Sequence, residues 1–198
     1  MLMWMLPFVL LNRNGRKAIG IRMPSSIRWV VYGFLMGIAG SVIMYLIGEL
    51  FYGDTLHNWF VYIAGTYDAP GINLEENRLA IFLIFTTVSM TFSPIGEEFL
   101  YRGLIHASFV PRFGENKASL LDSLAFAITH LAHFGIVYVA TGWDFYPMPA
   151  LIWVTMMFLA SRLFFIVKQR SGSIWGAILT HAGFNLGMTY IIIYCILP

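Results

Sequence analysis

The sequence predicts an all-α, multi-pass transmembrane helical bundle with about five to six spans, and composition, run length and charge placement each indicate it. Of its 198 residues, 59% are hydrophobic and only 11% are charged, and the mean hydropathy is +0.73. Soluble domains carry roughly a quarter charged residues, so the chain belongs to the membrane class. No polar stretch is long enough for a second domain, and we therefore expect one integral membrane domain over residues 1–198.

The chain begins with a short apolar segment, MLMWMLPFVLL, which lacks the basic start and small-residue cleavage site of a signal peptide. A span needs ~20 residues, so we expect this segment to be retained as an interfacial or partial membrane segment. Apolar runs long enough to cross a bilayer follow at about 28–50, 79–95, 119–140, 149–167 and 173–197. Stretches with turn-forming or polar residues separate them, and we expect loops or turns at 53–77, 110–118 and 141–149.

The placement of Lys and Arg predicts the orientation, because cytoplasmic loops of membrane proteins are enriched in both. If the linker with Arg13, Arg16 and Lys17 is cytoplasmic, alternate crossings bring Arg102, Arg112, Lys117, Lys168 and Arg170 to the same side. The opposite side receives one basic residue, Arg78, together with Asp54, Asp68, Glu75, Glu76 and Asp144. We expect a multi-pass cell-membrane protein whose site opens towards the cytoplasm. The short chain favours a prokaryotic source, and hence the inner membrane.

Composition also excludes some partners and sites. The basic residues are scattered along the chain and form no band typical of a nucleic-acid interface. The single cysteine, Cys195, excludes an internal disulfide framework and a cysteine-ligated zinc site.

Three charged residues gather in SPIGEEFLYRG, directly after an uncharged run. Glu98 and Arg102 are four residues apart, so on a helix they can pair on one face. Glu97 points roughly 100° away from Glu98, which leaves one carboxylate free for proton chemistry. A structural ion pair that closes the end of a span is an equal alternative for these residues taken alone.

Two later spans carry histidines in apolar surroundings, at LAFAITHLAHFG and ILTHAGFNLG. Phe126 and His130 share a helical face, as do His181 and Asn185. Each pair alone is typical of core histidines or of polar contacts between helices. His133, one turn after His130, could extend a polar network, and for His106 a surface position is favoured over one at the entrance of a site.

Together the three spans indicate hydrolysis. A carboxylate or an imidazole can take a proton from water, and imidazole or carboxamide donors can stabilise the oxyanion of a tetrahedral intermediate. Buried Glu, His and Arg also mark proton relays, so a small proton-coupled transporter stays open as an alternative, although no internal repeat supports it.

The three motifs, EEFLYR, FAITH and HAGFN, fit E-E-x-x-x-R, F-x-x-x-H and H-x-x-x-N in that order. The chain thereby resembles the CPBP family of intramembrane proteases, which includes type II CAAX prenyl endopeptidases and bacteriocin-immunity (Abi) proteins. The resemblance covers about residues 78–190. It implies an endopeptidase that hydrolyses a peptide bond of a peptide or membrane-anchored protein substrate in the lipid bilayer. A non-catalytic immunity or regulatory scaffold of the same fold is the alternative.

The resemblance also implies a role for each matching residue. Glu97 would activate water, helped by His130, and His181 and Asn185 would stabilise the oxyanion. Supporting roles would fall to Glu98, Arg102 and Phe126. We expect no cofactor and no metal; the alternative is zinc held by Glu97, His130 and His181.

Overall fold

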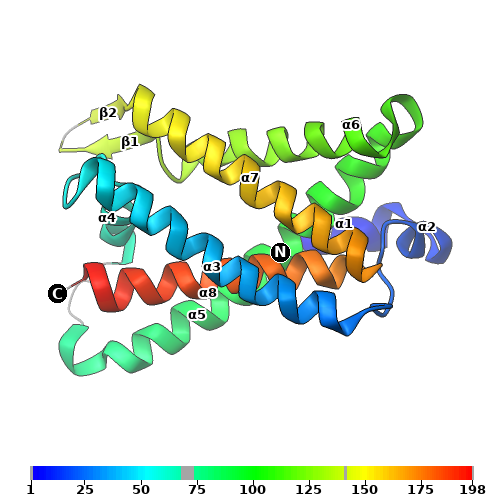
Figure 1. The fold of residues 1–198 in the computed structure, drawn as a ribbon, viewed down its shortest axis with the longest axis horizontal. Coiled ribbons are helices and arrows are strands. Elements are labelled where there is room, and N and C mark those ends of the chain that lie inside the picture. The colour runs from blue at the N-terminus through cyan, green and yellow to red at the C-terminus, as the bar shows by residue number, and fades with distance from the viewer. Residues whose placement is uncertain (1, 68–73, 141, 198) are drawn as a thin grey trace.

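A computed structural model describes residues 2–67, 74–140 and 142–197, and these are predominantly helical (Figure 1). The α-helices are α1 (Leu2–Leu10), α2 (Arg13–Ala18), α3 (Ile27–Tyr52), α4 (Trp59–Ala64), α5 (Leu74–Glu98), α6 (His106–Thr129), α7 (Pro147–Ser171) and α8 (Ile174–Ile191). Short 3-10 segments are η1 (Gly65–Tyr67) and η3 (His130–Ala132), and π-helical segments are η2 (Phe99–Ile105) and η4 (Ile192–Ile196). The expected all-α membrane bundle is confirmed.

Within the described ranges, four helical segments are long and apolar enough to cross a membrane: Ile27–Tyr52, Glu75–Ala132, Pro147–Ser171 and Ile174–Ile196. The second contains two of the expected spans, 79–95 and 119–140, because α5, η2 and α6 follow one another without a loop. The expected loop at 110–118 is therefore wrong. The chain changes direction there within α6, at Gly114, whose φ of 74° is not helical.

The expected spans and loops also differ from the structure near the ends of the helices. The run 119–140 is helical only as far as Ala132, and an antiparallel hairpin of β1 (Ile136–Val139) and β2 (Gly142–Phe145) follows. A short apolar run of this kind fits strand or helix equally well, and Gly135, with φ of 111°, separates the two. The expected loop at 53–77 contains the helix α4, and its residues 68–73 lie outside the described part.

The closest helix packing joins α3 and α8, and it depends on small residues. A side chain at Gly37 would meet the backbone oxygen of Thr180 at 2.1 Å, and one at Gly183 would meet that of Phe34 at 2.3 Å. Such close approach is how helices associate where no hydrophobic effect drives them together. Gly183 of HAGFN and Gly37 of α3 thus allow α8, which carries His181, to pack closely against α3.

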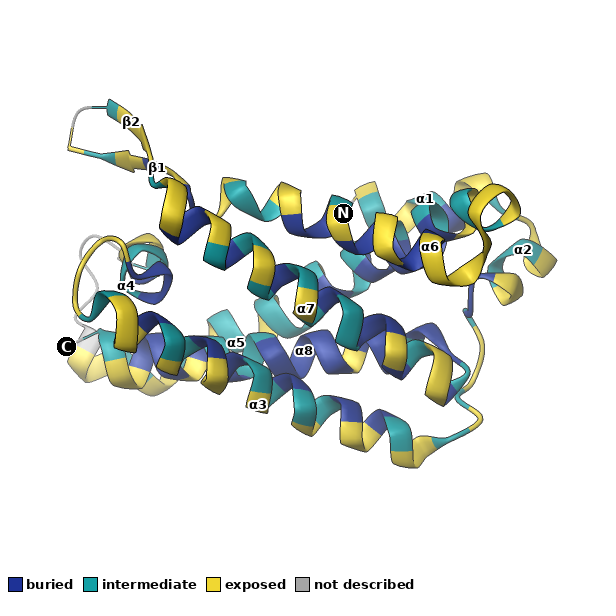
Figure 2. Ribbon diagram, turned by 45° about the horizontal axis from the view of Figure 1, so that its top comes forward, coloured by how far each residue is buried: buried dark blue, intermediate teal, exposed yellow. Residues whose placement is uncertain are grey.

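The two ends of the bundle differ in their elements (Figure 1). One end carries α2, the bend of α6 and the C-terminal end of α7. The basic residues of this end include Arg16, Arg112, Lys117, Lys168 and Arg170, and we call it the basic end. The other end carries α4, the β-hairpin and the C-terminus. Many residues on the outer faces of the long helices are exposed (Figure 2), and large apolar residues such as Leu35, Leu46 and Leu159 are among them, as expected where lipid surrounds a bundle.

The N-terminal segment forms α1, which is too short to span and packs against α5 and η2. The indole nitrogen of Trp4 donates to the carbonyl of Phe92 at 2.8 Å, and Phe8 meets Phe99 edge to face with ring centroids 6.1 Å apart. The expected partial segment therefore supports the helix that carries the two glutamates.

Candidate active site

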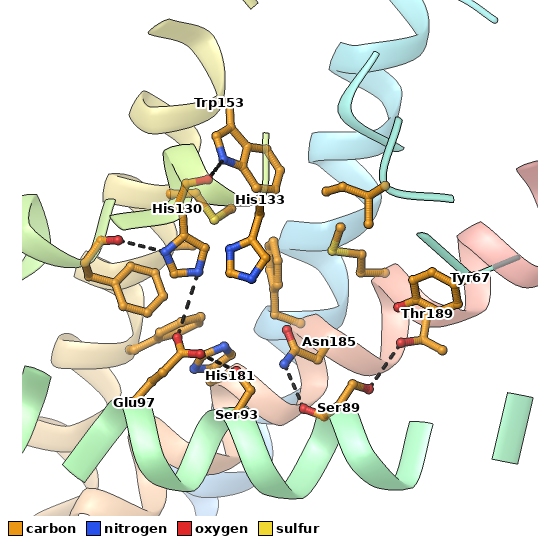
Figure 3. A pocket seen from close by; sticks show the side chains of 17 residues that line it. Tyr67, Ser89, Ser93, Glu97, His130, His133, Trp153, His181, Asn185 and Thr189 are labelled. Carbon is orange, nitrogen blue, oxygen red and sulfur yellow. Dashed lines mark hydrogen bonds and ion pairs between the residues drawn. The ribbon is translucent and has the colours of Figure 1, made fainter. Parts of the chain in front are cut away.

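A cavity of about 190 Å³ lies between α5, α7 and α8, and it is also lined by the start of η3 and by η1 (Figure 3). Glu97, His130, His181 and Asn185 all line it. The four residues come from three separate regions of the sequence, so their convergence is a property of the fold. Their expected roles depend on which of their polar atoms are bonded and which face the cavity.

The junction of α5 and η2 places the two glutamates in different surroundings. Pro94 interrupts the hydrogen bonding of α5, and the π-helical turns of η2 begin directly after Glu98. Such π-helical insertions are rare and frequently accompany functional sites. Glu97 lines the cavity, whereas Glu98 is completely buried behind it.

Glu98 forms the expected pair with Arg102, since Oε2 lies 3.0 Å from Nε and both side chains are fully buried. The second oxygen, Oε1, lies 2.9 Å from Nδ1 of His181. Because an ionised carboxylate only accepts hydrogen bonds, Nδ1 of His181 must donate. Glu98 therefore fixes the His181 ring and stabilises any positive charge on it.

Aromatic rings hold the buried guanidinium of Arg102. Its Nη1 and Nη2 have no hydrogen-bond partner among the described residues, but its Cζ lies 4.3 Å from the ring centroid of Phe126 and 5.3 Å from that of Phe164. Cation–π contact of this kind is stronger where water is excluded. Phe164 also stacks on His181, with ring centroids 4.8 Å apart and planes 15° apart. This role of Phe164 was not predicted from the sequence.

His130 is oriented by two backbone hydrogen bonds. Its Nδ1 lies 2.7 Å from the carbonyl oxygen of Phe126, and its own carbonyl accepts from the indole nitrogen of Trp153 at 2.8 Å. A carbonyl can only accept, so Nδ1 carries the proton and the neutral ring has its lone pair on Nε2. This nitrogen lies 3.8 Å from Oε2 of Glu97.

Glu97 has one bonded and one unbonded oxygen. Ser93, one turn earlier on α5, donates its hydroxyl to Oε1. The other oxygen, Oε2, is buried without a hydrogen-bond partner in the described structure. Since the great majority of buried polar atoms are bonded, this oxygen is an exception. Its 3.8 Å distance to Nε2 of His130 is too long for a direct hydrogen bond, but both atoms can bind one water.

Asn185 lies farther along the same wall of the cavity. Its Nδ2 donates to the carbonyl of Ser89 at 2.8 Å, and the hydroxyls of Ser89 and Thr189 are 3.2 Å apart. Tyr67 from η1 also reaches Thr189, and burial raises the pKa of its phenol above the ordinary value despite this bond. One amide hydrogen of Asn185 remains for another acceptor.

A four-residue spacing underlies this polar wall. α5 contributes Ser89, Ser93 and Glu97, and α8 contributes His181, Asn185 and Thr189. Residues four apart share a helical face, and the two faces run side by side in opposite directions. The serines and the threonine were missed from the sequence, although their spacing is visible there.

Other residues are placed as follows. His133 also lines the cavity, with its ring centroid 5.0 Å from that of His130. His106, expected at the surface, is buried in a different cluster, where it contacts Asp122 and Glu115. The cavity extends from Glu97 to Ile63 and Tyr67, away from the basic end.

A zinc site would require Glu97, His130 and His181 to gather around one ion. In the described part of the chain, no three His, Cys, Asp or Glu side chains are close enough together to hold a metal ion. The side chains as placed therefore do not fit zinc, and we derive no step through a metal.

Comparison with known proteins supplies the family. The family model "Type II CAAX prenyl endopeptidase Rce1-like" matches residues 79–187, which is more than half of the chain and includes all three motifs. Neither the curated proteins nor the solved structures contain a match. The matched region runs from α5 to α8 and includes every helix that contributes a side chain from the three motifs. The chain belongs to the Rce1-like family of type II CAAX prenyl endopeptidases, which are membrane endopeptidases.

Proposed function

We propose that this protein is an intramembrane endopeptidase that hydrolyses a peptide bond of a membrane-associated substrate with a water activated by Glu97. One observation carries the proposal: the unbonded Oε2 of Glu97 faces the lone pair on Nε2 of His130 across 3.8 Å, at the wall of a cavity. An unpaired carboxylate oxygen inside a membrane bundle is costly, so its retention needs a function.

Water would bind between these two atoms. Glu97 accepts a proton from the water, His130 orients it through Nε2, and the resulting hydroxide attacks the substrate carbonyl. The same carboxylic acid then returns the proton to the leaving amine, so that the proton count balances over the cycle. Ser93 holds the other carboxylate oxygen, which aims Oε2 at the water.

The oxyanion of the tetrahedral intermediate would be bound by the remaining amide hydrogen of Asn185 and by Nε2 of His181. To donate, Nε2 must be protonated, which makes the ring an imidazolium because Nδ1 already carries a hydrogen. The Glu98 carboxylate at 2.9 Å stabilises that cation. This is the support that Glu98 and Arg102 give to the site.

We propose that the protein resides in the cell membrane with its basic end in the cytoplasm, following the distribution of Lys and Arg. The substrate would be a peptide or a protein held in or at the bilayer. We also expect the site to open towards the cytoplasm. The cavity lining itself extends to Ile63 and Tyr67, which lie towards the opposite end of the bundle.

The decisive experiment uses the purified full-length protein in lipid vesicles with internally quenched reporter peptides that carry a membrane anchor. We expect cleavage at a single peptide bond, identified by mass spectrometry, and none with Glu97→Gln. If a wide reporter library yields no cleavage, the protein is a scaffold. If cleavage persists in Glu97→Gln, the assignment of the base is wrong.

We further propose that the reaction is metal-free. Activity should then survive exhaustive dialysis against a chelator, with the same rate before and after. A zinc-dependent site would lose its activity on chelation and regain it when zinc is added. That result would make His181 a ligand and remove it from the oxyanion site.

A further inference from the structure

The β-hairpin between α6 and α7 has one aromatic and apolar face. Its strands pair antiparallel in a register that places Ile136 opposite Phe145 and Tyr138 opposite Trp143. Alternate residues of a strand point to the same side, so these four side chains share one face. They are 45%, 51%, 54% and 76% exposed, in that order.

The hairpin itself is firmly attached to the bundle. On its other face, Val137 is completely buried, as is Phe134 just before it, which contacts Trp59 and Trp153. The amide of Tyr138 also donates to the hydroxyl of Tyr62 on α4 at 2.9 Å. A two-stranded hairpin is stable only when an apolar face packs against something else. Exposed apolar patches commonly mark sites of interaction with a membrane or another protein, so we expect this aromatic face to have a partner.

The position of the hairpin indicates which partner this is. It joins two long apolar helices at the end opposite the basic end, and it projects outward from them there (Figures 1 and 2). Met148 and Leu151, the next exposed side chains along α7, continue the apolar surface directly into a spanning helix. The aromatic face is thus followed directly in the chain by exposed apolar side chains of a helix that is long and apolar enough to span. Trp and Tyr are enriched where membrane proteins meet the headgroup boundary.

We propose that the face formed by Ile136, Tyr138, Trp143 and Phe145 inserts into the headgroup–acyl boundary of the leaflet at the α4 end of the bundle. This inference does not depend on the proposed function. It has a consequence for the site, because only two residues separate β1 from His133, and His130 begins the same short segment. A membrane-bound hairpin fixes the wall that carries His130 relative to the bilayer.

A pair of neighbouring residues provides the test, because Trp143 lies on the proposed lipid face and Asp144 on the other. In a Cys195→Ser background, single cysteines at Trp143→Cys and Asp144→Cys are labelled with the polarity-sensitive fluorophore NBD. The full-length protein is placed in phosphatidylcholine vesicles with or without lipids that carry a doxyl quencher high on the acyl chain. We expect blue-shifted, strongly quenched emission from position 143 and water-like, weakly quenched emission from position 144.

Tyr138→Cys, opposite Trp143, provides a second label on the same face and replaces Trp143→Cys if that variant does not fold. Equal, water-like emission from both faces would overturn the proposal. A blue shift at positions 138 or 143 without quenching by doxyl lipid would also overturn it, because protein would then cover the face. Dilution of the protein in lipid would show whether that protein is a second copy of the chain.

Discussion

Two histidine–carboxylate clusters of the described residues can be compared, and they differ in how many of their polar atoms are bonded. In the first cluster, His106 bonds Asp122 through Nδ1 at 2.7 Å and Glu115 through Nε2 at 2.9 Å. Each ring nitrogen therefore has a carboxylate partner, and neither is left free for another group. The bonds tie the start of α6 to the part beyond its bend at Gly114.

In the second cluster, the same residue types leave part of their bonding capacity unused. His130 bonds a carbonyl through Nδ1 only, and Glu97 accepts from Ser93 through Oε1 only. The remaining atoms, Nε2 and Oε2, face each other at 3.8 Å. The two clusters contain the same residue types, so residue type does not separate the proposed catalytic cluster from the other one. Unsatisfied atoms that share a cavity with room for water are the distinguishing feature.

The largest expected effect is on turnover in the second cluster. Glu97→Gln keeps the shape of the side chain but cannot accept a proton from water, so kcat should fall by ~10²–10⁴, the usual contribution of a general base. The variant should elute and melt like the parent, because the amide oxygen of Gln can still accept the hydrogen bond from Ser93. Near-parental turnover would show that Glu97 is not the base. The two clusters would then not differ in catalytic role.

The next effect concerns the oxyanion. Removal of one oxyanion donor typically lowers turnover by ~10²–10³, so Asn185→Ala should retain a small, measurable activity. Asn185→Asp keeps the size and is the matched variant; it should be no more active, because a carboxylate repels the oxyanion. Full activity of Asn185→Ala in steady-state assays would leave His181 as the sole donor from the polar wall.

A substitution in the first cluster should change the stability of the protein and leave its turnover unchanged. Asp122→Asn keeps an oxygen that can accept from His106 but removes the charge, and a neutral hydrogen bond is weaker than a charge-assisted one by about 1 kcal/mol. We expect a lower melting temperature in detergent, with kcat per folded molecule unchanged. If kcat falls while the melting temperature stays constant, the two clusters are functionally coupled and their separation is wrong.

Some of this site follows from the sequence because helical spacing determines it. The Glu98–Arg102 pair was predicted from a four-residue spacing, and the structure gives 3.0 Å between Oε2 and Nε. The freedom of Glu97 follows from the same geometry, since a neighbour on a helix points about 100° away. The convergence of three spans was expected only from the order of the motifs. No spacing within one helix predicts contacts between helices.

Other features could not be predicted, for identifiable reasons. His106 and Asp122 meet across the bend at Gly114, and no periodic pattern relates them. Phe164 is one apolar residue among many in α7, and only the packing of α7 on α8 stacks it on His181. Hydroxyls in helices commonly bond their own backbone, as Thr91 does to the carbonyl of Thr87. The sequence therefore did not distinguish Ser93 from such a residue.

The smallest expected effect belongs to Ser93, and it tests whether the half-bonded state of Glu97 is part of the mechanism. Ser93→Ala removes the donor to Oε1 and lets the carboxylate rotate away from the water. One hydrogen bond to a charged group contributes about 1.5 kcal/mol, or about tenfold in rate. We expect this loss in kcat, with KM unchanged, because the hydroxyl holds the base and does not bind substrate.

Ser93→Thr keeps the hydroxyl and should restore most of the activity. Thr91→Ala removes an exposed hydroxyl from the same helix and should leave kcat unchanged. If Ser93→Ala changes only KM or the melting temperature, Ser93 serves binding or folding, and the aim of Oε2 comes from His130 alone.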